Sequence, residues 1–534
     1  MIYKKDIDKF INIIEDIYNV ILQPIDSIYK ITAIIKYKRK LNIKNSYNFG
    51  DFYYNIMDKN KEKGVIYTPD YIARYVVKNT ISKESIIKNP YLKIVDPACG
   101  CGNIIINCFN HLRKLFIENL DEINEFNNIS LKKEDIDRHI ICNNLYGFDI
   151  DIIALKILII DLFYLSGIIG ANFLNRDFLI ELDDEKFDIF IGNPPYVGHK
   201  FIDKEYSSII KKKYFNIYKD KSDLHYCFFL QSLNMLNKKG KISFITSRYF
   251  LEGPSGENLR KILKNVCSIN KIVDFYGIRP FKNIGIDPLI IFLINEQNSN
   301  EYIEVIKPLK GVKKDSFCKS VFLNEGKEYD KFNINKNKLN NKGWILRNRE
   351  EMCIINKIEE KSFTTLNNIC NSFQGIITGC DKAFVVNKKI IDEENLEKDI
   401  IKPWIKSSFI QKNKIHKKDM FLIYSDLITQ EEKYTNIIKH IYDYKERLMN
   451  RRECKKGVRQ WYHLQWGRIQ NIFEDKKIVF PFKSNKNRFA LDKGSYFSAD
   501  IYCLTLKENV PFTYEYLLYL LNEEIAQLNF LNYI

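Results

Sequence analysis

The sequence lacks the features typical of disulfide-linked, zinc-binding and membrane-spanning proteins. Its 12 cysteines are scattered over 534 residues, without a CxxC pair or a Cys/His spacing of zinc-ligand type. We therefore expect that the protein binds no metal and is located in the reducing cytoplasm. The opening MIYKKDID is not a signal peptide. The most apolar run, ILIIDLFYLSGIIGANF from Ile157, contains Asp161 and falls short of the ~18 to 20 uninterrupted apolar residues of a membrane span. It predicts a buried helix.

Apolar and basic residues are abundant instead. Apolar residues make up 45% of the chain and aromatic residues 14%, which excludes disorder, and 534 residues exceed what one compact core holds. The formal net charge is +16, and residues 401–500 contain 22 Lys or Arg against 11 Asp or Glu. This excess suits a polyanionic partner, although a solvated basic surface would give the same composition.

Hydrophobic periodicity divides the chain into three regions. Residues 1–62 are helical in pattern and predict an N-terminal extension without a chemical motif. Residues 63–306 alternate short β-rich runs with helical stretches, which predicts a doubly wound, Rossmann-like α/β sheet. Residues 307–534 lose this alternation and predict a second domain of mixed α+β structure. The β-rich runs are KIVDPACG from Lys93, LYGFDI from Leu145, FDIFIGNPPY from Phe187, GKISFIT from Gly240, KIVDFYG from Lys271 and PLIIFLIN from Pro288.

The first motif is VDPACGCGN, which follows a predicted strand and precedes a helical run. Gly100 and Gly102 allow a tight turn and a close approach of the backbone to a ligand, and Asp96 ends the strand. The phosphate-cradling pattern GxxxxGK[ST] is missing, so the pocket suits a nucleoside without phosphate. Such a glycine turn is also common in purely structural βα connections.

Two acidic residues follow at later strand ends. Asp149 in YGFDID is placed to accept hydrogen bonds from a ribose diol, and it lies too far from the glycine turn for a typical dinucleotide site. In RDF, Asp177 can reach an adenine amino group and Phe178 can pack on its ring. Taken alone, Asp149 and Asp177 are equally typical of surface or capping carboxylates.

The sequence NPPY directly follows the apolar strand FDIFIG. Two prolines stiffen the backbone and remove two N–H donors, so the turn presents carbonyl oxygens. If the Asn193 side-chain oxygen and the Pro194 carbonyl accept the hydrogens of an aromatic amino group, its nitrogen lone pair is directed toward a methyl donor without a covalent intermediate. Pro195 completes the turn, and Tyr196 offers a face for an unstacked base. A rigid structural turn is the alternative for NPPY in isolation.

With GVIYTPDYIARYVV at Gly64, these motifs occur in the order typical of gamma-class amino-methyltransferases, and the chain resembles the DNA adenine methyltransferases of that class. FQGIITGCDKAF at Phe373 and SADIY at Ser498 extend the resemblance to the clostridial orphan members, which continue beyond the equivalent of the final LNFLNYI. The resemblance implies S-adenosylmethionine as cofactor, double-stranded DNA as partner, a flipped adenine in an A-rich site such as CAAAAA, and no cognate nuclease. The cofactor-binding residues it implies are Tyr67, Thr68, Pro69, Asp96, Ala98, Cys99, Gly100, Gly102, Asn103, Asp149, Ile150, Asp177, Phe178 and Asn193.

The second domain contains candidates for DNA contact. RRECKKGVRQWYHLQWGR from Arg451 interleaves cations, which can neutralise phosphates, with aromatic side chains, which can stack on bases. A helix with a basic face and an aromatic core face is the alternative for this segment, and QGIITG is either a loop close to DNA or a hairpin turn. The candidate DNA-binding residues are Lys200, Gln374, Arg451, Arg452, Lys455, Lys456, Arg459, Trp461, Tyr462, Trp466, Arg468, Lys483, Asn485 and Arg488.

Three other functions compete with this interpretation. A fused restriction and methylation enzyme would need a nuclease motif, and the region before Lys63 contains no PD…ExK arrangement. A methyltransferase for protein glutamine or ribosomal RNA would leave the large basic second domain unexplained, and a non-catalytic DNA-specificity protein would leave NPPY unexplained. A 5-methylcytosine enzyme needs a thiolate beside the base, whereas Cys99 and Cys101 lie in the glycine turn and predict tight packing. We expect a monomeric, nucleoid-associated protein without an obligate protein partner.

Overall fold

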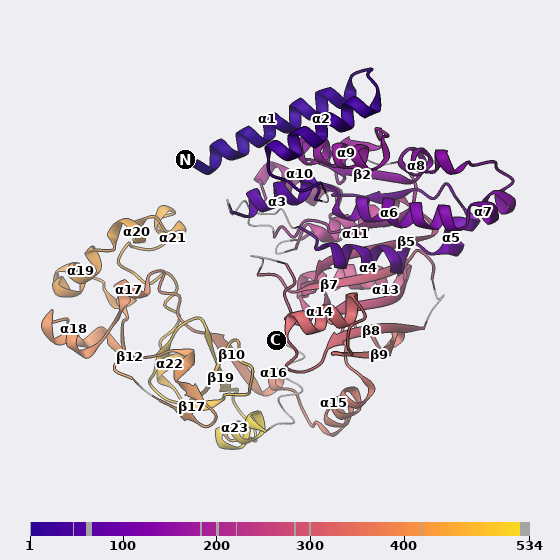
Figure 1. The fold of residues 1–534 in the computed structure, drawn as a ribbon. Helices are drawn as coiled ribbons and strands as arrows, with labels where there is room; N and C mark the ends of the chain where they lie inside the picture. Colours follow the sequence, from indigo (N-terminus) through magenta and orange to yellow (C-terminus); the bar gives the residue numbers. More distant parts are fainter. Residues whose placement is uncertain are drawn as a thin grey trace. The chain divides into compact units, whose positions relative to one another are not determined.

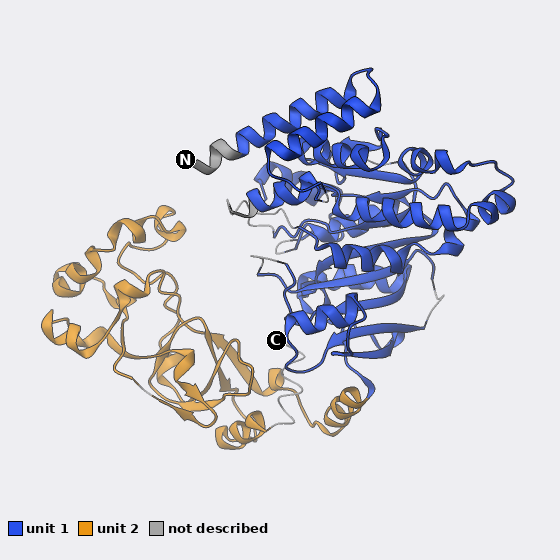
Figure 2. Ribbon diagram, viewed as in Figure 1, with its two compact units in different colours: residues 1–349 blue, residues 350–534 orange. Residues whose placement is uncertain are grey.

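The computed structural model describes residues 2–45, 47–59, 67–181, 184–198, 202–219, 222–281, 285–297, 301–416 and 418–523. The chain forms two compact units, residues 1–349 and residues 350–534 (Figure 2). All 12 cysteines carry free thiols. Among the described residues, no helix is both long enough and apolar enough to cross a membrane.

The first unit is built on a nine-stranded sheet with the order β3-β2-β1-β4-β5-β7-β6-β8-β9 (Figure 1). β1 pairs in parallel with β2 and with β4, while β7 pairs antiparallel with both β5 and β6. The six predicted β-rich runs are all confirmed as strands. The strands are β1 (Ile94–Asp96), β2 (Leu145–Asp149), β3 (Phe173–Asn175), β4 (Phe187–Gly192), β5 (Leu236–Ser247), β6 (Ser268–Asp274), β7 (Pro288–Ile294), β8 (Tyr302–Pro308) and β9 (Tyr329–Asn335).

Helices cover both faces of this sheet, as expected for a doubly wound fold. Along β4, Ile189 and Ile191 join the core on one face and Phe190 joins the core on the other, because successive side chains of a strand alternate. The first core contains residues of α1 (Ile2–Leu22), α2 (Ser27–Lys40), α4 (Asp70–Thr80), α6 (Asn103–Glu118) and α9 (Ile152–Ser166). The second core contains residues of α10 (Lys204–Lys213), α11 (His225–Met235) and α13 (Glu257–Val266).

The N-terminal helices belong to this unit. α1 packs on α9, and so does α3 (Phe49–Lys59). The apolar run from Ile157 falls in α9, which is buried as expected and ends at Ser166. Smaller helical segments complete the unit, namely α5 (Lys83–Lys88), α7 (Leu120–Asn127), α8 (Ile136–His139), α12 (Tyr249–Glu252) and α14 (Lys314–Phe322).

The division between the units lies at residues 349/350, whereas the sequence places a boundary at 306/307. That expected boundary falls inside β8. β8 pairs in parallel with β6, and β9 pairs antiparallel with β8, so the sheet continues past the last βα motif. β9, at the edge of the sheet, is mostly exposed or partly exposed, and both strands contain charged residues that interrupt the apolar run typical of the central strands.

The second unit has mixed α+β structure, as expected. One four-stranded sheet has the order β10-β19-β16-β17, and another has the order β11-β15-β12-β18. Their strands are β10 (Cys370–Gln374), β11 (Val385–Val386), β12 (Ile401–Ile405), β15 (Phe421–Ile423), β16 (Lys477–Pro481), β17 (Ala490–Asp492), β18 (Tyr496–Phe497) and β19 (Ile501–Leu506), and β13 (Ile410–Gln411) pairs with β14 (Lys414–Ile415). Its helices are α15 (Arg349–Lys361), α16 (Leu366–Ile369), α17 (Asp381–Phe384), α18 (Lys388–Glu393), α19 (Thr435–Tyr442), α20 (Lys445–Met449), α21 (Arg452–Lys455), α22 (Asn471–Glu474) and α23 (Tyr514–Asn522).

Candidate active site

The glycine turn and the NPPY turn leave two adjacent strands at the same edge of the sheet. β1 and β4 are parallel neighbours, and the strand order reverses between them, which is where open α/β sheets form a ligand crevice. The two turns lie close together. There is no room for a side chain on Gly192, since an added Cβ would lie 2.6 Å from Asp96 Oδ1. The tertiary structure therefore brings the two motifs together as the sequence predicts.

Asp96 is buried at the end of β1. Burial raises the pKa of its carboxyl to about 8, although the backbone N–H of Ala98 donates a hydrogen bond of 3.1 Å that favours the ionised form. The charge of Asp149 adds to the increase. Asp96 is therefore largely protonated at neutral pH when nothing cationic is bound beside it.

The glycines of the first turn are required by packing inside the protein. Gly100 and Gly102 have φ angles of +51° and +81°, which other residues rarely adopt. A side chain on Gly100 would collide with the hydroxyl of Tyr54, and one on Gly102 would collide with Leu158. The sequence predicts close approach of a ligand at these glycines, whereas in the structure side chains of helices α3 and α9 occupy the adjacent space.

Asp149 ends β2 and holds the glycine turn. Its Oδ2 accepts a hydrogen bond from the Gly100 N–H at 2.8 Å, and its Oδ1 accepts one from the Asp151 N–H at 2.8 Å. A carboxylate has about four acceptor positions, so Asp149 retains acceptor capacity for a diol. The next residue, Ile150, is 77% exposed and presents an apolar surface at the same strand end.

Asp177 and Phe178 follow β3, which ends at Asn175. Asp177 Oδ2 accepts a hydrogen bond from the Tyr206 hydroxyl at 2.8 Å, and its Oδ1 accepts one from the Leu179 N–H. Phe178 is buried and stacks between Phe148 and Phe228. Its ring, expected to pack on an adenine, belongs instead to the core, because these aromatic neighbours already cover it.

The side chain of Asn193 lies at the surface of the crevice, half-buried. Its Nδ2 donates to Thr68 Oγ1 at 3.1 Å, and its Oδ1 accepts a hydrogen bond from the hydroxyl of Tyr196. Thr68 is buried, and its carbonyl oxygen accepts from Asn103 Nδ2 at 3.4 Å. Thus Tyr67 and Thr68, the glycine turn and the NPPY turn are joined by one chain of contacts around Asn193.

Tyr196 is only 7% exposed and packs edge-on against His225, with 6.2 Å between ring centroids. His225 Nδ1 lies 2.8 Å from Asp223 Oδ1, and its ring is fully buried. Burial raises the pKa of Asp223, but the charge and hydrogen bonds of His225 outweigh this and hold that pKa below its usual value. The face of Tyr196 expected to stack on a base is therefore covered in this conformation.

Helix α3 is the part of the site that the sequence analysis missed. Tyr54 accepts a hydrogen bond from the Cys101 N–H at 3.3 Å, and Asp51 accepts one from the Tyr67 hydroxyl at 2.7 Å. Asp51 and Tyr67 line a cavity of about 330 Å³ that also includes Asn103. Residues 49–59 carry only helical periodicity, and no local pattern connects them with a motif more than 40 residues later.

In the second unit, two arginines expected to bind phosphates are held within the protein. Arg451 donates from Nε and both terminal nitrogens to four backbone carbonyls, including those of Trp461 and His463 at 2.8 and 2.9 Å. Arg459 forms a 2.6 Å ion pair with Asp426. These contacts hold the loop after α21. They also give both guanidinium groups partners within the protein.

Arg468 and Arg488 also have internal partners. Arg468 donates to the side chain of Gln374, the last residue of β10, and to the Gly375 carbonyl. The segment that follows β10 is bridged to Trp466 and does not form a hairpin turn. Arg488 donates to Ser484 and to the carbonyls of Ser407 and Ile410.

The remaining DNA-binding candidates differ in exposure. Only Arg452–Lys455 is helical in the RRECKKGVRQWYHLQWGR segment, which excludes a long amphipathic helix there. Trp461 is half-buried, Tyr462 is buried, and Trp466 is 41% exposed. Lys200 lies outside the described residues. The exposed polar candidates, which face solvent on the second unit, are Arg452, Lys455, Lys456, Lys483 and Asn485.

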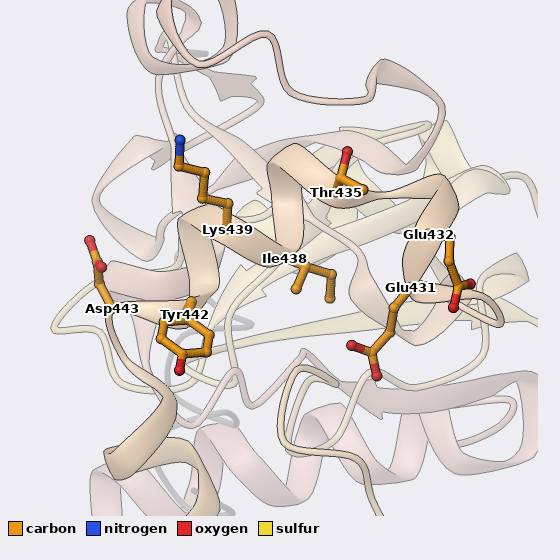
Figure 3. Close-up of a pocket in the computed structure, with 7 residues that line it drawn as sticks. All are labelled: Glu431, Glu432, Thr435, Ile438, Lys439, Tyr442 and Asp443. Carbon is orange, nitrogen blue, oxygen red and sulfur yellow. The ribbon is translucent and has the colours of Figure 1, made fainter.

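A separate hollow of about 570 Å³ on the second unit has an acidic rim (Figure 3). Glu431, Glu432 and Asp443 contribute three carboxylates, and Lys439 contributes one cation. This charge is unfavourable for binding phosphates. The hollow is lined by Glu431, Glu432, Thr435, Ile438, Lys439, Tyr442 and Asp443.

Three family models match consecutive parts of the chain. Residues 82–176 match "MmeI, DNA-methyltransferase domain", and residues 143–281 match "Eco57I restriction-modification methylase". Residues 402–534 match "TaqI-like C-terminal specificity domain". The first two matches contain the glycine turn, Asp149 and NPPY.

Individual proteins similar to this chain are type II methyltransferases. The type II methyltransferase M.HindII of Haemophilus influenzae is 25% identical over 88% of this chain and 85% of its own length. The chain is similar to type II DNA methyltransferases. M.BstVI of Geobacillus stearothermophilus is 25% identical over 62% of each chain, and the type II restriction enzyme and methyltransferase RM.Eco57I of Escherichia coli is 23% identical over 85% of this chain. The chain thus spans 62% of the length of M.BstVI and 53% of that of RM.Eco57I.

Solved structures share the fold. The restriction-modification enzyme MmeI in complex with DNA superposes with a TM-score of 0.59 at 15% identity, over 85% of this chain and 62% of that chain. The DrdV–DNA complex gives a TM-score of 0.52 at 13% identity, over 82% of this chain and 49% of that chain. These similarities support a methyltransferase fold with a large, mostly parallel central sheet, followed by a specificity domain.

Proposed function

We propose that the protein transfers a methyl group from S-adenosylmethionine to the exocyclic amino group of an adenine that is flipped out of double-stranded DNA. The observation that carries this proposal is the position of Asn193. Asn193 is half-buried at the end of β4, the parallel neighbour of β1, and its side-chain oxygen already accepts a hydrogen bond from a hydroxyl. An amino group is a donor of the same kind.

The residues around the crevice fit a cofactor that is a nucleoside without phosphate. Asp149 retains acceptor capacity for a ribose diol, and the exposed Ile150 can pack on a purine ring. Asp96 places a titratable carboxyl near the expected cationic centre. When bound, the cofactor supplies an electrophilic methyl group on a sulfonium.

Asn193 and the Pro194 carbonyl orient the target nitrogen by accepting its two hydrogens. Thr68 holds the Asn193 amide so that its oxygen, not its NH₂ group, points toward the base. As the new N–C bond forms and the S–C bond breaks, the amino nitrogen loses one proton to solvent. Tyr196 must leave its hydrogen bond with Asn193 to make room for the base, and its ring is then available for stacking.

The resemblance noted above supports a finer assignment. We propose an A-rich site, CAAAAA with the last adenine modified, and a monomeric orphan enzyme of the cytoplasm and nucleoid without a partner nuclease. Long-read sequencing of DNA from a methylation-free host that expresses the protein tests both levels. Methyladenine at one sequence context is expected. Methylcytosine, or no modified base at all, would refute the proposal.

A fused restriction and methylation enzyme remains the second candidate, because the chain matches 53% of RM.Eco57I. Incubation of the purified protein with unmethylated target DNA and Mg²⁺ separates the two. Intact DNA is expected, whereas specific double-strand cleavage would favour the fused enzyme.

A further inference from the structure

Helix α3 is attached firmly to the core beside the glycine turn. The backbone N–H groups of Phe49 and Gly50, at the start of the helix, donate to the buried Asp161 at 3.0 and 3.1 Å. Tyr53 donates to Asp151 at 3.0 Å. Asp161 therefore caps α3, and the apolar helix α9 contains this one buried carboxylate for that reason.

This attachment places Asp51 in the wall of the 330 Å³ cavity. Its Oδ1 accepts from the Tyr67 hydroxyl at 2.7 Å, and among the described residues its Oδ2 accepts a long, 3.4 Å hydrogen bond from the Asn48 N–H. Lys38 is close enough for its charge to interact with Asp51, but its ammonium donates to the carbonyls of Asn45 and Tyr47. Asp51 thus retains acceptor capacity toward the cavity.

A second carboxylate, that of Asp70, lines the same cavity but has different partners. Asp70 forms an ion pair with Arg74 and accepts from Asn107 Nδ2 at 3.0 Å. Its charge is already balanced by a cation. Of the two carboxylates that line this cavity, Asp51 is therefore the better acceptor for a cationic ligand group.

The cavity lies next to the catalytic asparagine along the chain of contacts. Asn193 Nδ2 reaches Thr68, and Thr68 accepts from Asn103, which itself lines the cavity together with Tyr67. A methyl donor directed at the base must lie beside Asn193. The amino-acid arm of that donor extends three carbon atoms from its sulfur, with an ammonium and a carboxylate at the end.

We propose that Asp51 binds the α-ammonium of the cofactor's amino-acid arm, so that the N-terminal helices form part of the cofactor site. This rests on the proposed function. Asn103 and Asn107 line the same cavity from one face of α6, one turn apart, but Asn107 Nδ2 already donates to Asp70 and to the Asn103 carbonyl. Asp51 thereby distinguishes the complete cofactor from nucleosides that lack the arm.

The experiment measures binding by calorimetry with S-adenosylmethionine, S-adenosylhomocysteine and 5′-methylthioadenosine, which lacks the amino-acid arm. Asp51→Asn retains the size and the acceptor for Tyr67 but loses the charge. Its affinity for the two complete ligands is expected to fall about 10- to 100-fold, the usual loss for a charged hydrogen bond, with the affinity for 5′-methylthioadenosine changed less than about twofold.

Asp70→Asn is the matched control, because Asp70 lines the same cavity but is paired with Arg74. It is expected to bind all three ligands as the wild type does. An equal loss for all three ligands in Asp51→Asn would show a structural effect and overturn the inference, as would no loss at all. If the wild type binds none of the ligands, the proposed function fails as well. If the wild type binds the ligands and Asp51→Asn binds them with the same affinity, only the role of Asp51 is overturned.

Discussion

The hydroxyl of Tyr196 donates a hydrogen bond to the side-chain oxygen of Asn193. The two residues flank the prolines of one turn, and the hydroxyl occupies the position that a substrate amino group would need. Under the proposed function, entry of the base requires release of this hydrogen bond. Until then, the hydroxyl of Tyr196 satisfies the polar oxygen of Asn193.

Asn193→Ala is expected to retain cofactor binding and to lose about 10²- to 10³-fold in the methyl-transfer rate, because the lost acceptor acts mainly in the transition state. Single-turnover transfer of a radiolabelled methyl group measures the rate, and calorimetry measures cofactor binding. A rate within a few-fold of wild type would contradict the role of Asn193.

Tyr196→Phe and Tyr196→Ala separate the hydrogen bond from stacking. The Phe variant loses only the hydroxyl that closes the site, so its methylation rate should stay within a few-fold of wild type. The Ala variant loses the ring and about 1–3 kcal/mol of base stacking, so it should show weaker 2-aminopurine fluorescence enhancement on DNA binding. Equal behaviour of the two variants would argue against a stacking role.

Arg451 and Arg452 are adjacent but differ in their contacts. Arg451→Ala should lower the free energy of unfolding by about 2–3 kcal/mol, because it leaves several backbone carbonyls without a donor. Arg452 is exposed, and Arg452→Ala should change stability by less than about 0.5 kcal/mol. If Arg452 contacts a phosphate, the slope of log binding constant against log salt becomes shallower by about 0.9. Denaturant titration and salt-dependent DNA binding check the pair.

The pKa of Asp96, raised to about 8 by burial, gives cofactor binding a pH dependence. A sulfonium cation favours the ionised carboxylate, so binding releases a proton below pH 8. Affinity for S-adenosylmethionine should therefore rise between pH 6 and pH 8 and level off above it. Calorimetry in buffers of different ionisation enthalpy reports the released proton. The neutral variant Asp96→Asn should lose this rise, and a wild-type affinity independent of pH would contradict the coupling.

The strands and their terminal motifs could be predicted from the sequence because each signal is local. A mostly apolar run such as FDIFIG predicts a strand buried on both faces, and Asn193 must then follow at its end. β8 and β9 were not predicted because charged residues interrupt the apolar pattern of both, and β9, the edge strand, is also largely exposed.

Contacts between distant segments determined the remaining features. The sequence predicts that the side chain of Arg451 contacts a phosphate. In the structure, it donates instead to carbonyls of Thr378 and of the 461–463 loop. The sequence predicts that the ring of Phe178 packs on an adenine. In the structure, the ring stacks on Phe148 and Phe228.

By itself, the sequence determined the order of chemical groups along one sheet edge, because strand ends and proline or glycine turns depend on neighbouring residues. Only the tertiary structure decided which of those groups are free to meet a ligand. Asp51 illustrates the difference: it becomes part of the site because Asp161, 110 positions later, holds the start of its helix. Such a contact depends on packing between helices far apart in the chain, and no local pattern of residues records it.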